Sequence, residues 1–105
     1  MDAPQQFTLK PKYGLWINGE EVDAISGKTF DIENPEDGSI FTTVAEGDKE
    51  DIELALDAAH AAFDSGVWSE MPARERGRIM MKAAQLLRDR LDYIISIEVL
   101  STGRA

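Results

Sequence analysis

The sequence predicts an α/β fold in which two β-hairpins are followed by three helices. Between residues 13 and 45, short runs of β-branched and aromatic residues alternate with clusters of turn-forming residues, which is the pattern of hairpins. From Asp48 onward, apolar residues recur at spacings of three and four, which is the period of an α-helix. A length of 105 residues is typical of a single domain, and a chain of this length buries only a small core.

The first hairpin is expected to join residues 13–17 to residues 20–22. Asn18 and Gly19 lie between these runs, and Asn-Gly is the dipeptide best suited to a two-residue type I′ turn, in which both residues have positive φ. We therefore expect a tight turn at this point.

The second hairpin is expected to join residues 29–33 to residues 40–45. Phe30 and Ile32 alternate with polar neighbours, as in a half-buried strand. The intervening residues 34–38 read Asn-Pro-Glu-Asp-Gly, and this composition is typical of a turn.

The first helix is expected over residues 48–65. Asp48 is suited to cap its N-terminus, and Glu50 and Asp51 place negative charge at the positive end of the helix dipole. A single apolar stripe follows, formed by Ile52, Ala55, Leu56, Ala59, Ala62 and Phe63. Ser65 and Gly66 provide a stop.

A second helix is expected over residues 72–90 and a third over residues 91–101. Pro72 suits a first helical turn, where its missing N–H has no partner to lose. Gly77 costs about 1 kcal/mol relative to alanine inside a helix, so we expect another backbone to approach it closely. The third helix is apolar on nearly every side, so we expect further structure to cover it and regard residues 13–105 as an incomplete unit.

The charge of the chain excludes several classes of partner. Twenty acidic and 11 basic residues give a net charge of −9, which repels nucleic acid and anionic lipid. Trp16 and Trp68 are expected to pack in the interior, because no basic residues alternate with them as in a base-stacking surface. No apolar run approaches the roughly 18 residues of a membrane span. Residues 1–12 read as an extended tail without the features of a signal peptide, so we expect a cytoplasmic protein with no nucleic-acid or membrane partner.

One basic stripe departs from this acidic background. Arg74, Arg78 and Lys82 recur every four residues along the second helix and so share one face. The stripe suits contact with phosphate, or pairing with carboxylates of other segments or of another subunit. The acidity of the remaining chain favours carboxylates.

The sequence assigns no catalytic and no cofactor-binding residue. The chain contains no cysteine, which removes thiol nucleophiles and thiolate metal sites, and its eight glycines form no phosphate-binding motif. His60 lies one turn from Asp57 and Asp64. This face has the geometry for a metal, but a solvated helix surface accounts for all three residues.

Nearly the whole chain, from about Tyr13 to Arg104, resembles the opening of an aldehyde dehydrogenase. The resemblance is carried by WINGEEVDA, SGKTFDIENPEDGSI, VAEGDKEDIELALDAAHAAF, the W-S-x-M-P-A-R-x-R-G-R-I segment and the closing E-x-x-x-x-G-R. The family's closing motif more often reads Gly-Lys-Pro, whereas this chain has Gly103-Arg104-Ala105.

The resemblance implies that residues 13–105 form the outer, N-terminal part of a Rossmann-like coenzyme-binding domain. The intact parent is then an NAD(P)-dependent, homo-oligomeric oxidoreductase that oxidises a small aldehyde to a carboxylic acid through a cysteine thiohemiacetal. The segments that carry the cysteine, the general base and the coenzyme loop come later in the family. We therefore expect this chain to be an inactive scaffold without cofactor, whose partners are the remainder of the enzyme or other subunits.

Two further readings remain open. Some family members bind a structural monovalent cation through main-chain carbonyls that correspond here to Ile32 and Glu33, with another ligand beyond Ala105. Alternatively, the chain is a truncated product or an excised domain that acts as a non-catalytic interaction module with intact subunits. The sequence is compatible with NAD and with NADP, since the residue that reads the ribose 2′ position lies in a later strand.

Overall fold

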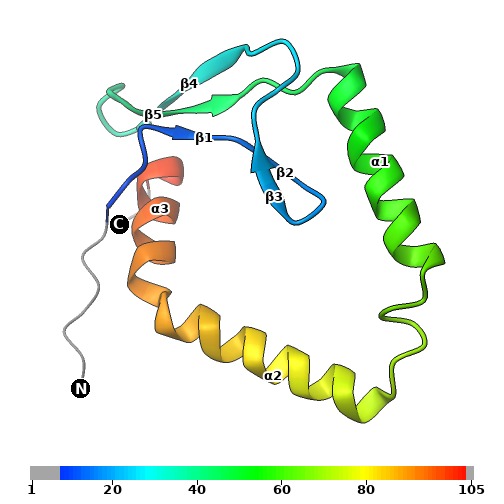
Figure 1. The fold of residues 1–105 in the computed structure, drawn as a ribbon. Coiled ribbons are helices and arrows are strands. Elements are labelled where there is room, and N and C mark those ends of the chain that lie inside the picture. Colours follow the sequence, from blue (N-terminus) through cyan, green and yellow to red (C-terminus); the bar gives the residue numbers. More distant parts are fainter. Residues whose placement is uncertain (1–7, 104–105) are drawn as a thin grey trace.

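The structure, a computed structural model, describes residues 8–103 as two small β-sheets followed by three helices (Figure 1). The predicted α/β class, with hairpins before helices, is confirmed. The sheets hold strands β1 (Lys12–Tyr13), β2 (Leu15–Ile17), β3 (Glu20–Val22), β4 (Thr29–Glu33) and β5 (Ile40–Ala45). The helices are α1 (Lys49–Asp64), α2 (Ala73–Asp89) and α3 (Leu91–Thr102).

The β2–β3 hairpin contains the expected turn. Ile17 pairs with Glu20 in antiparallel register, so only Asn18 and Gly19 connect the strands. Their φ angles are 54° and 78°, and two successive positive φ values are the signature of a type I′ turn.

The larger sheet has the strand order β1-β5-β4, with β4 antiparallel and β1 parallel to β5. The β4–β5 hairpin follows the sequence prediction, and its register shifts between Ile32 and Glu33. The turn after β4 is closed by main-chain hydrogen bonds from Asn34 N to Ser39 O and from Gly38 N to Asn34 O, each 2.7 Å long.

The predicted tail of residues 1–12 needs a correction at its end. Lys12 belongs to β1 and pairs with Thr43, and the hydroxyl of Thr42 donates to the main-chain oxygen of Lys10 at 2.8 Å. Lys10 also forms an ion pair with Glu21 at 2.6 Å. A two-residue parallel strand carries no periodicity, so the sequence did not reveal it. Residues 1–7 lie outside the described part of the chain.

Helix α1 begins with a complete capping box. The Asp48 side chain receives a hydrogen bond from the N–H of Lys49, and the Asp51 carboxylate receives one from the N–H of Asp48 at 2.9 Å. Asp51 also accepts from the N–H of Ile25 at 3.0 Å and is buried. The negative charge expected in the first turn therefore also fixes the β3–β4 connection to the helix.

Helices α2 and α3 depart from the sequence expectations in their surroundings. A methyl group added at Gly77 would meet no atom within 4 Å, so the close backbone approach expected there is absent from the described residues. Trp16 and Trp68, expected in the interior, are 72% and 44% exposed. Within residues 8–103, no backbone comes close to Gly77, and no segment fully covers Trp16 or Trp68.

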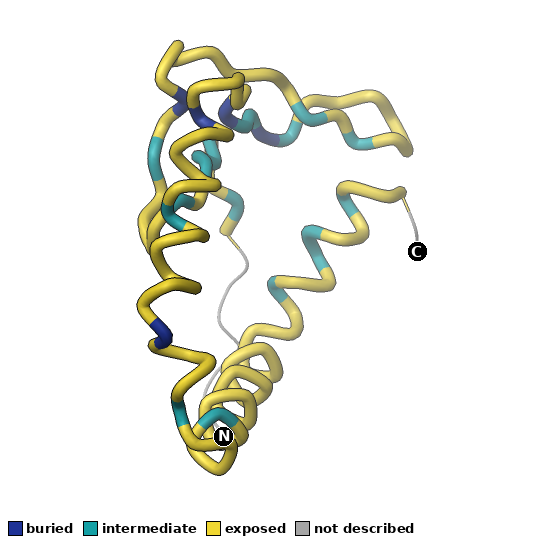
Figure 2. The backbone as a smooth tube through the Cα atoms, turned by 90° about the vertical axis from the view of Figure 1, so that its right-hand side faces the viewer, coloured by how far each residue is buried: buried dark blue, intermediate teal, exposed yellow. Residues whose placement is uncertain are grey.

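The described chain forms an open frame with little core. Helix α1 leads away from the sheets, α2 crosses below them and α3 returns to the larger sheet (Figure 1). The radius of gyration is 17.3 Å, whereas a compact domain of this length has about 13 Å. The buried apolar residues are Ala24 and Ala45 alone among those described, and Figure 2 shows exposed residues along most of all three helices. No helix between residues 8 and 103 is long and apolar enough to cross a membrane.

Candidate functional site

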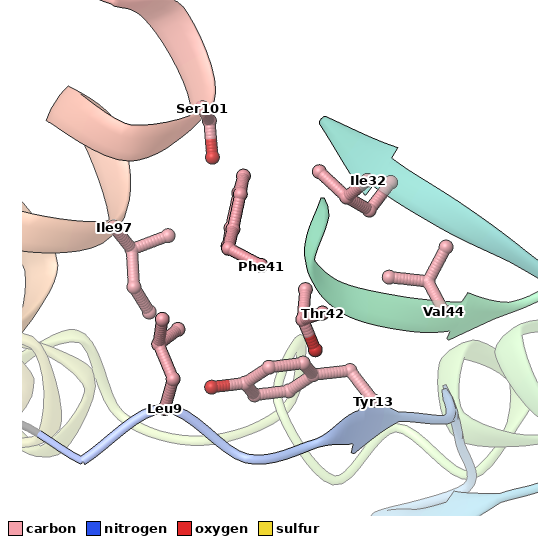
Figure 3. A pocket seen from close by; sticks show the side chains of 8 residues that line it. All are labelled: Leu9, Tyr13, Ile32, Phe41, Thr42, Val44, Ile97 and Ser101. Carbon is pink, nitrogen blue, oxygen red and sulfur yellow. The ribbon is translucent and has the colours of Figure 1, made fainter. Parts of the chain in front are cut away.

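A cavity of about 290 Å³ lies where α3 meets the larger sheet. Figure 3 shows Ile97 of α3 facing Leu9 and Phe41, with Ile32 of β4 and Val44 of β5 on the sheet side. Aliphatic and aromatic side chains thus form most of its wall.

Three hydroxyl groups provide the polar side-chain atoms of this cavity, and they belong to Tyr13, Thr42 and Ser101. The Tyr13 hydroxyl lies 3.0 Å from that of Tyr93 on α3. This hydrogen bond raises the pKa of Tyr93 above its ordinary value, because it favours the neutral phenol, and burial adds to the effect. The cavity is therefore an apolar packing cleft beside a hydrogen-bonded tyrosine pair.

The chemistry of the wall does not fit a nicotinamide coenzyme. No charged side chain lines the cleft, whereas a pyrophosphate needs cationic groups or a loop of free N–H donors. The chain also lacks cysteine. This cleft therefore offers no group suited to hold a coenzyme, and the absence of catalytic and coenzyme-binding residues stays a prediction.

The two residues of the cation hypothesis lie together at the end of β4. Ile32 pairs with Thr42, and Glu33, after the register shift, pairs with Ile40. The structure describes no group of three or more acidic, histidine or cysteine side chains suited to a metal within residues 8–103. That finding does not bear on main-chain carbonyl ligands, so the role of Ile32 and Glu33 remains a prediction.

The end of α3 lies against the turn that follows this strand. Gly103 caps α3 with a φ of 70°, and a methyl group added there would lie 3.0 Å from Cγ of Pro35. A larger residue at this position therefore has both an unfavourable backbone and a neighbour to displace. The chain consequently leaves α3 beside the carboxyl end of β4.

The other candidate side chains are exposed on the helices. His60, Asp57 and Asp64 lie on the surface of α1, and their interpretation as a solvated face stays a prediction. The basic stripe of α2, Arg74, Arg78 and Lys82, is exposed too.

Exposed apolar surface is the dominant feature of the chain. The total solvent-accessible surface of the chain is 8635 Å², whereas a compact monomer of 11.6 kDa has about 5,800 Å². Phe63 on α1 is 76% exposed, and Met81 on α2 is 74% exposed. A surface of this kind is typical of a segment that packs on further structure.

Sequence comparison identifies the structure to which such a surface belongs. The profile of the aldehyde dehydrogenase family matches residues 22–105. The chain belongs to the aldehyde dehydrogenase family. The expected resemblance is thereby confirmed.

Individual family members match over most of this chain but over little of their own length. Aldehyde dehydrogenase family 2 member C4 of Arabidopsis thaliana is 41% identical over 90 residues, which are 86% of this chain and 18% of that protein. The mitochondrial benzaldehyde dehydrogenase of Antirrhinum majus is 47% identical, with 86% and 17% covered. The chain therefore spans less than a fifth of the length of these two relatives.

A solved structure of the family has the same fold. Betaine aldehyde dehydrogenase of Staphylococcus aureus in complex with NAD+ superposes with a TM-score of 0.84 at 36% identity. The match covers 89% of this chain and 18% of that chain. The open frame is thus an aldehyde dehydrogenase substructure, consistent with part of a Rossmann-like α/β domain.

Proposed function

We propose that this chain is the N-terminal scaffold of an NAD(P)-dependent aldehyde dehydrogenase. The intact enzyme oxidises an aldehyde to a carboxylic acid through a cysteine thiohemiacetal, and NAD or NADP accepts the hydride when bound. The family membership and the NAD+ complex of the S. aureus enzyme support this role. The observation that carries it is the large apolar surface left exposed by α1, α2 and α3.

The residues of this chain contribute packing rather than chemistry. A thiohemiacetal needs a thiolate nucleophile, and the chain has none. Its apolar cleft and tyrosine pair position α3 against the larger sheet, and the capped start of α1 is joined to the β3–β4 connection. The remaining enzyme or other subunits of a homo-oligomer then cover the exposed faces.

Enzyme assays on the 105-residue chain test the absence of chemistry. We expect no NADH or NADPH from a panel of aliphatic and aromatic aldehydes, and no micromolar binding of either coenzyme by calorimetry. The S. aureus enzyme in the same assay provides the positive control. Coenzyme reduction that depends on this chain would contradict the scaffold role.

A second candidate function is a non-catalytic interaction module that engages intact subunits. Its support is the outer side of α3, where Ile95 is 49% and Val99 is 37% exposed. Immobilised chain should then capture a purified full-length aldehyde dehydrogenase, and Ile95→Lys should abolish capture. Absence of capture by the unmodified chain would leave the scaffold role alone. The cytoplasmic location stays a proposal under either function.

The main-chain oxygens of Ile32 and Glu33 are proposed as part of a monovalent-cation site of the intact enzyme. The position of Gly103 beside Pro35 supports this proposal, since it places the C-terminal end of α3 next to the turn that follows β4. Because a hard cation needs a nearly complete oxygen shell, we expect this chain alone to melt at the same temperature in potassium chloride and tetramethylammonium chloride. A potassium-specific rise in melting temperature would show that these residues suffice.

A further inference from the structure

A short segment near the N-terminus, residues 9–13, contacts three different parts of the fold; we call it the N-terminal strap. It contains β1 and lies along β5 of the larger sheet (Figure 1). Its side chains also reach the β2–β3 hairpin, the residue that follows β3, and α3. The strap therefore joins elements that are far apart in the sequence.

Main-chain groups fix the path of the strap on the larger sheet. The N–H of Thr43 donates to the main-chain oxygen of Pro11 at 3.2 Å. The hydroxyl of Thr42, a buried residue, donates to the main-chain oxygen of Lys10 at 2.8 Å. These bonds place the lysine side chains of the strap at the edge of the sheet.

The two lysines of the strap pair with carboxylates of and beside β3. Lys10 lies 2.6 Å from a carboxylate oxygen of Glu21, and Lys12 lies 2.8 Å from one of Asp23. The two lysines are two positions apart in an extended segment and so share one side of it. Within residues 8–103, these are the ion pairs that the structure contains. Both therefore serve to hold the strap against the hairpin.

The backbone at Gly14 independently fits this contact. Gly14 connects the strap to β2, and a methyl group added there would lie 2.6 Å from the main-chain oxygen of Val22. The same methyl group would lie 2.9 Å from Cγ of Glu21. A residue with a side chain would force the strap away from β3, so glycine allows the close approach.

Lys10 also holds the side chain that reaches α3. Its N–H donates to the hydroxyl of Tyr13 at 3.1 Å, and its ammonium group lies 5.0 Å from the centre of the Tyr13 ring. The Tyr13 hydroxyl in turn lies 3.0 Å from that of Tyr93. Figure 3 shows Leu9 and Tyr13 extending from the strap into the cleft that Ile97 of α3 also lines. One lysine thus contacts both the hairpin and the tyrosine that docks α3.

We propose that the N-terminal strap couples the β2–β3 hairpin to α3. The connection runs from Glu21 through Lys10 and Tyr13 to Tyr93. When Glu21 holds Lys10, the strap is already ordered, so the contact with Tyr93 forms at a smaller cost in conformational entropy. Loss of the hairpin contact therefore weakens the docking of α3 on the larger sheet. All four residues lie within the described chain, so the coupling depends neither on what covers the exposed helices nor on the proposed enzymatic parentage.

Amide hydrogen exchange of the 105-residue chain, resolved by residue, tests this coupling. Glu21→Lys removes the partner of Lys10 on β3, away from α3. We expect the amides of α3 to exchange about two- to fivefold faster in this variant, which is the range that the loss of one exposed ion pair produces.

The neighbouring residue provides a matched control. Glu20 is also exposed on β3 but forms neither of the two ion pairs, so Glu20→Lys should leave exchange in α3 unchanged. Lys10→Glu combined with Glu21→Lys restores the ion pair with its charges exchanged. This double variant should return α3 to within about twofold of the exchange rate in the unmodified chain.

Three results would overturn the proposal. The first is equal exchange in α3 for Glu20→Lys and Glu21→Lys, and the second is a double variant that exchanges as fast as Glu21→Lys alone. The third is an unmodified chain in which the amides of α3 are unprotected. Faster exchange confined to the hairpin in Glu21→Lys is a form of the first result and would show that the hairpin and α3 open independently.

Discussion

The hydroxyl groups of Tyr13 and Tyr93 lie 3.0 Å apart and join β1 to α3 across 80 positions of the sequence. The hydrogen bond lies beside the cleft between α3 and the larger sheet. The apolar side chains of Leu9, Phe41 and Ile97 line the same cleft. The return of α3 to the sheet thus combines one polar link with a small apolar contact.

Removing one hydroxyl of this pair should loosen α3 without unfolding the strands. For Tyr93→Phe we expect a loss of about 0.5–1.5 kcal/mol in the stability of α3 docking, the usual net value of one hydrogen bond. Amide hydrogen exchange is the measurement, with faster exchange expected in α3. Tyr13→Phe should have the same effect, and the double variant should lose less than the sum of both. Unchanged exchange in α3 would show that the hydroxyl pair does not stabilise the docking of α3.

Alkaline pH should weaken the same contact. The hydrogen bond with Tyr13 is the main cause that raises the pKa of Tyr93 above its ordinary value of 10.0. The folded state therefore keeps its proton to higher pH than the unfolded state. The stabilisation is complete below pH 10 and is lost as pH rises through the raised pKa. Amide hydrogen exchange should report a loss of α3 protection over this pH range in the native protein, whereas Tyr93→Phe, which lacks the hydrogen bond at every pH, should show no such pH-dependent loss.

Asp51 should matter far more than its exposed neighbour Glu50. Asp51 is 4% exposed and accepts hydrogen bonds from Ile25 and Asp48. Asp51→Ala leaves two N–H groups without this acceptor, so we expect a loss of about 1–3 kcal/mol. Glu50→Ala removes only a favourable charge near the helix N-terminus, for a loss of about 0.3–1 kcal/mol. Urea denaturation followed by tryptophan fluorescence compares the two, and equal midpoints would contradict the structural role of Asp51.

The Asn18-Gly19 turn should reject a β-branched residue. Gly19 has a φ of 78°, which a β-branched residue adopts only with strain. We expect Gly19→Val to destabilise the β2–β3 hairpin by more than about 1 kcal/mol, measured by the urea midpoint. Gly77→Ala is the contrast. It lies in a helix with open space around it and should stabilise by up to about 1 kcal/mol.

Local chemistry explains which parts of the fold were predictable. The Asn18-Gly19 turn and the Asp48 cap each depend on residues close in sequence, and both are found as expected. The parallel pairing of Lys12 with Thr43 and the contact of Tyr13 with Tyr93 join distant segments. Neither leaves a periodic signal in the sequence.

The incorrect expectations share one physical cause. Gly77, Trp16 and Trp68 were assigned neighbours because their residue types are typical of close packing. In the described chain they have open space or exposed surfaces instead. Residue types suit the contacts that are made in a whole protein. A segment taken alone lacks some of those contacts.

A scaffold segment of this family should be replaceable by the matching segment of another member. The rate of NADH formation tests this expectation in a chimera, in which residues 8–103 replace the structurally matching segment of the S. aureus betaine aldehyde dehydrogenase. A second chimera with Leu86→Lys, which places a charge on the apolar side of α2, serves as the packing control. We predict betaine aldehyde oxidation within about tenfold of the S. aureus enzyme, since 1.4 kcal/mol of lost positioning corresponds to one factor of ten, and a sharp loss with Leu86→Lys. A chimera that assembles to the native size but forms no NADH would contradict the account.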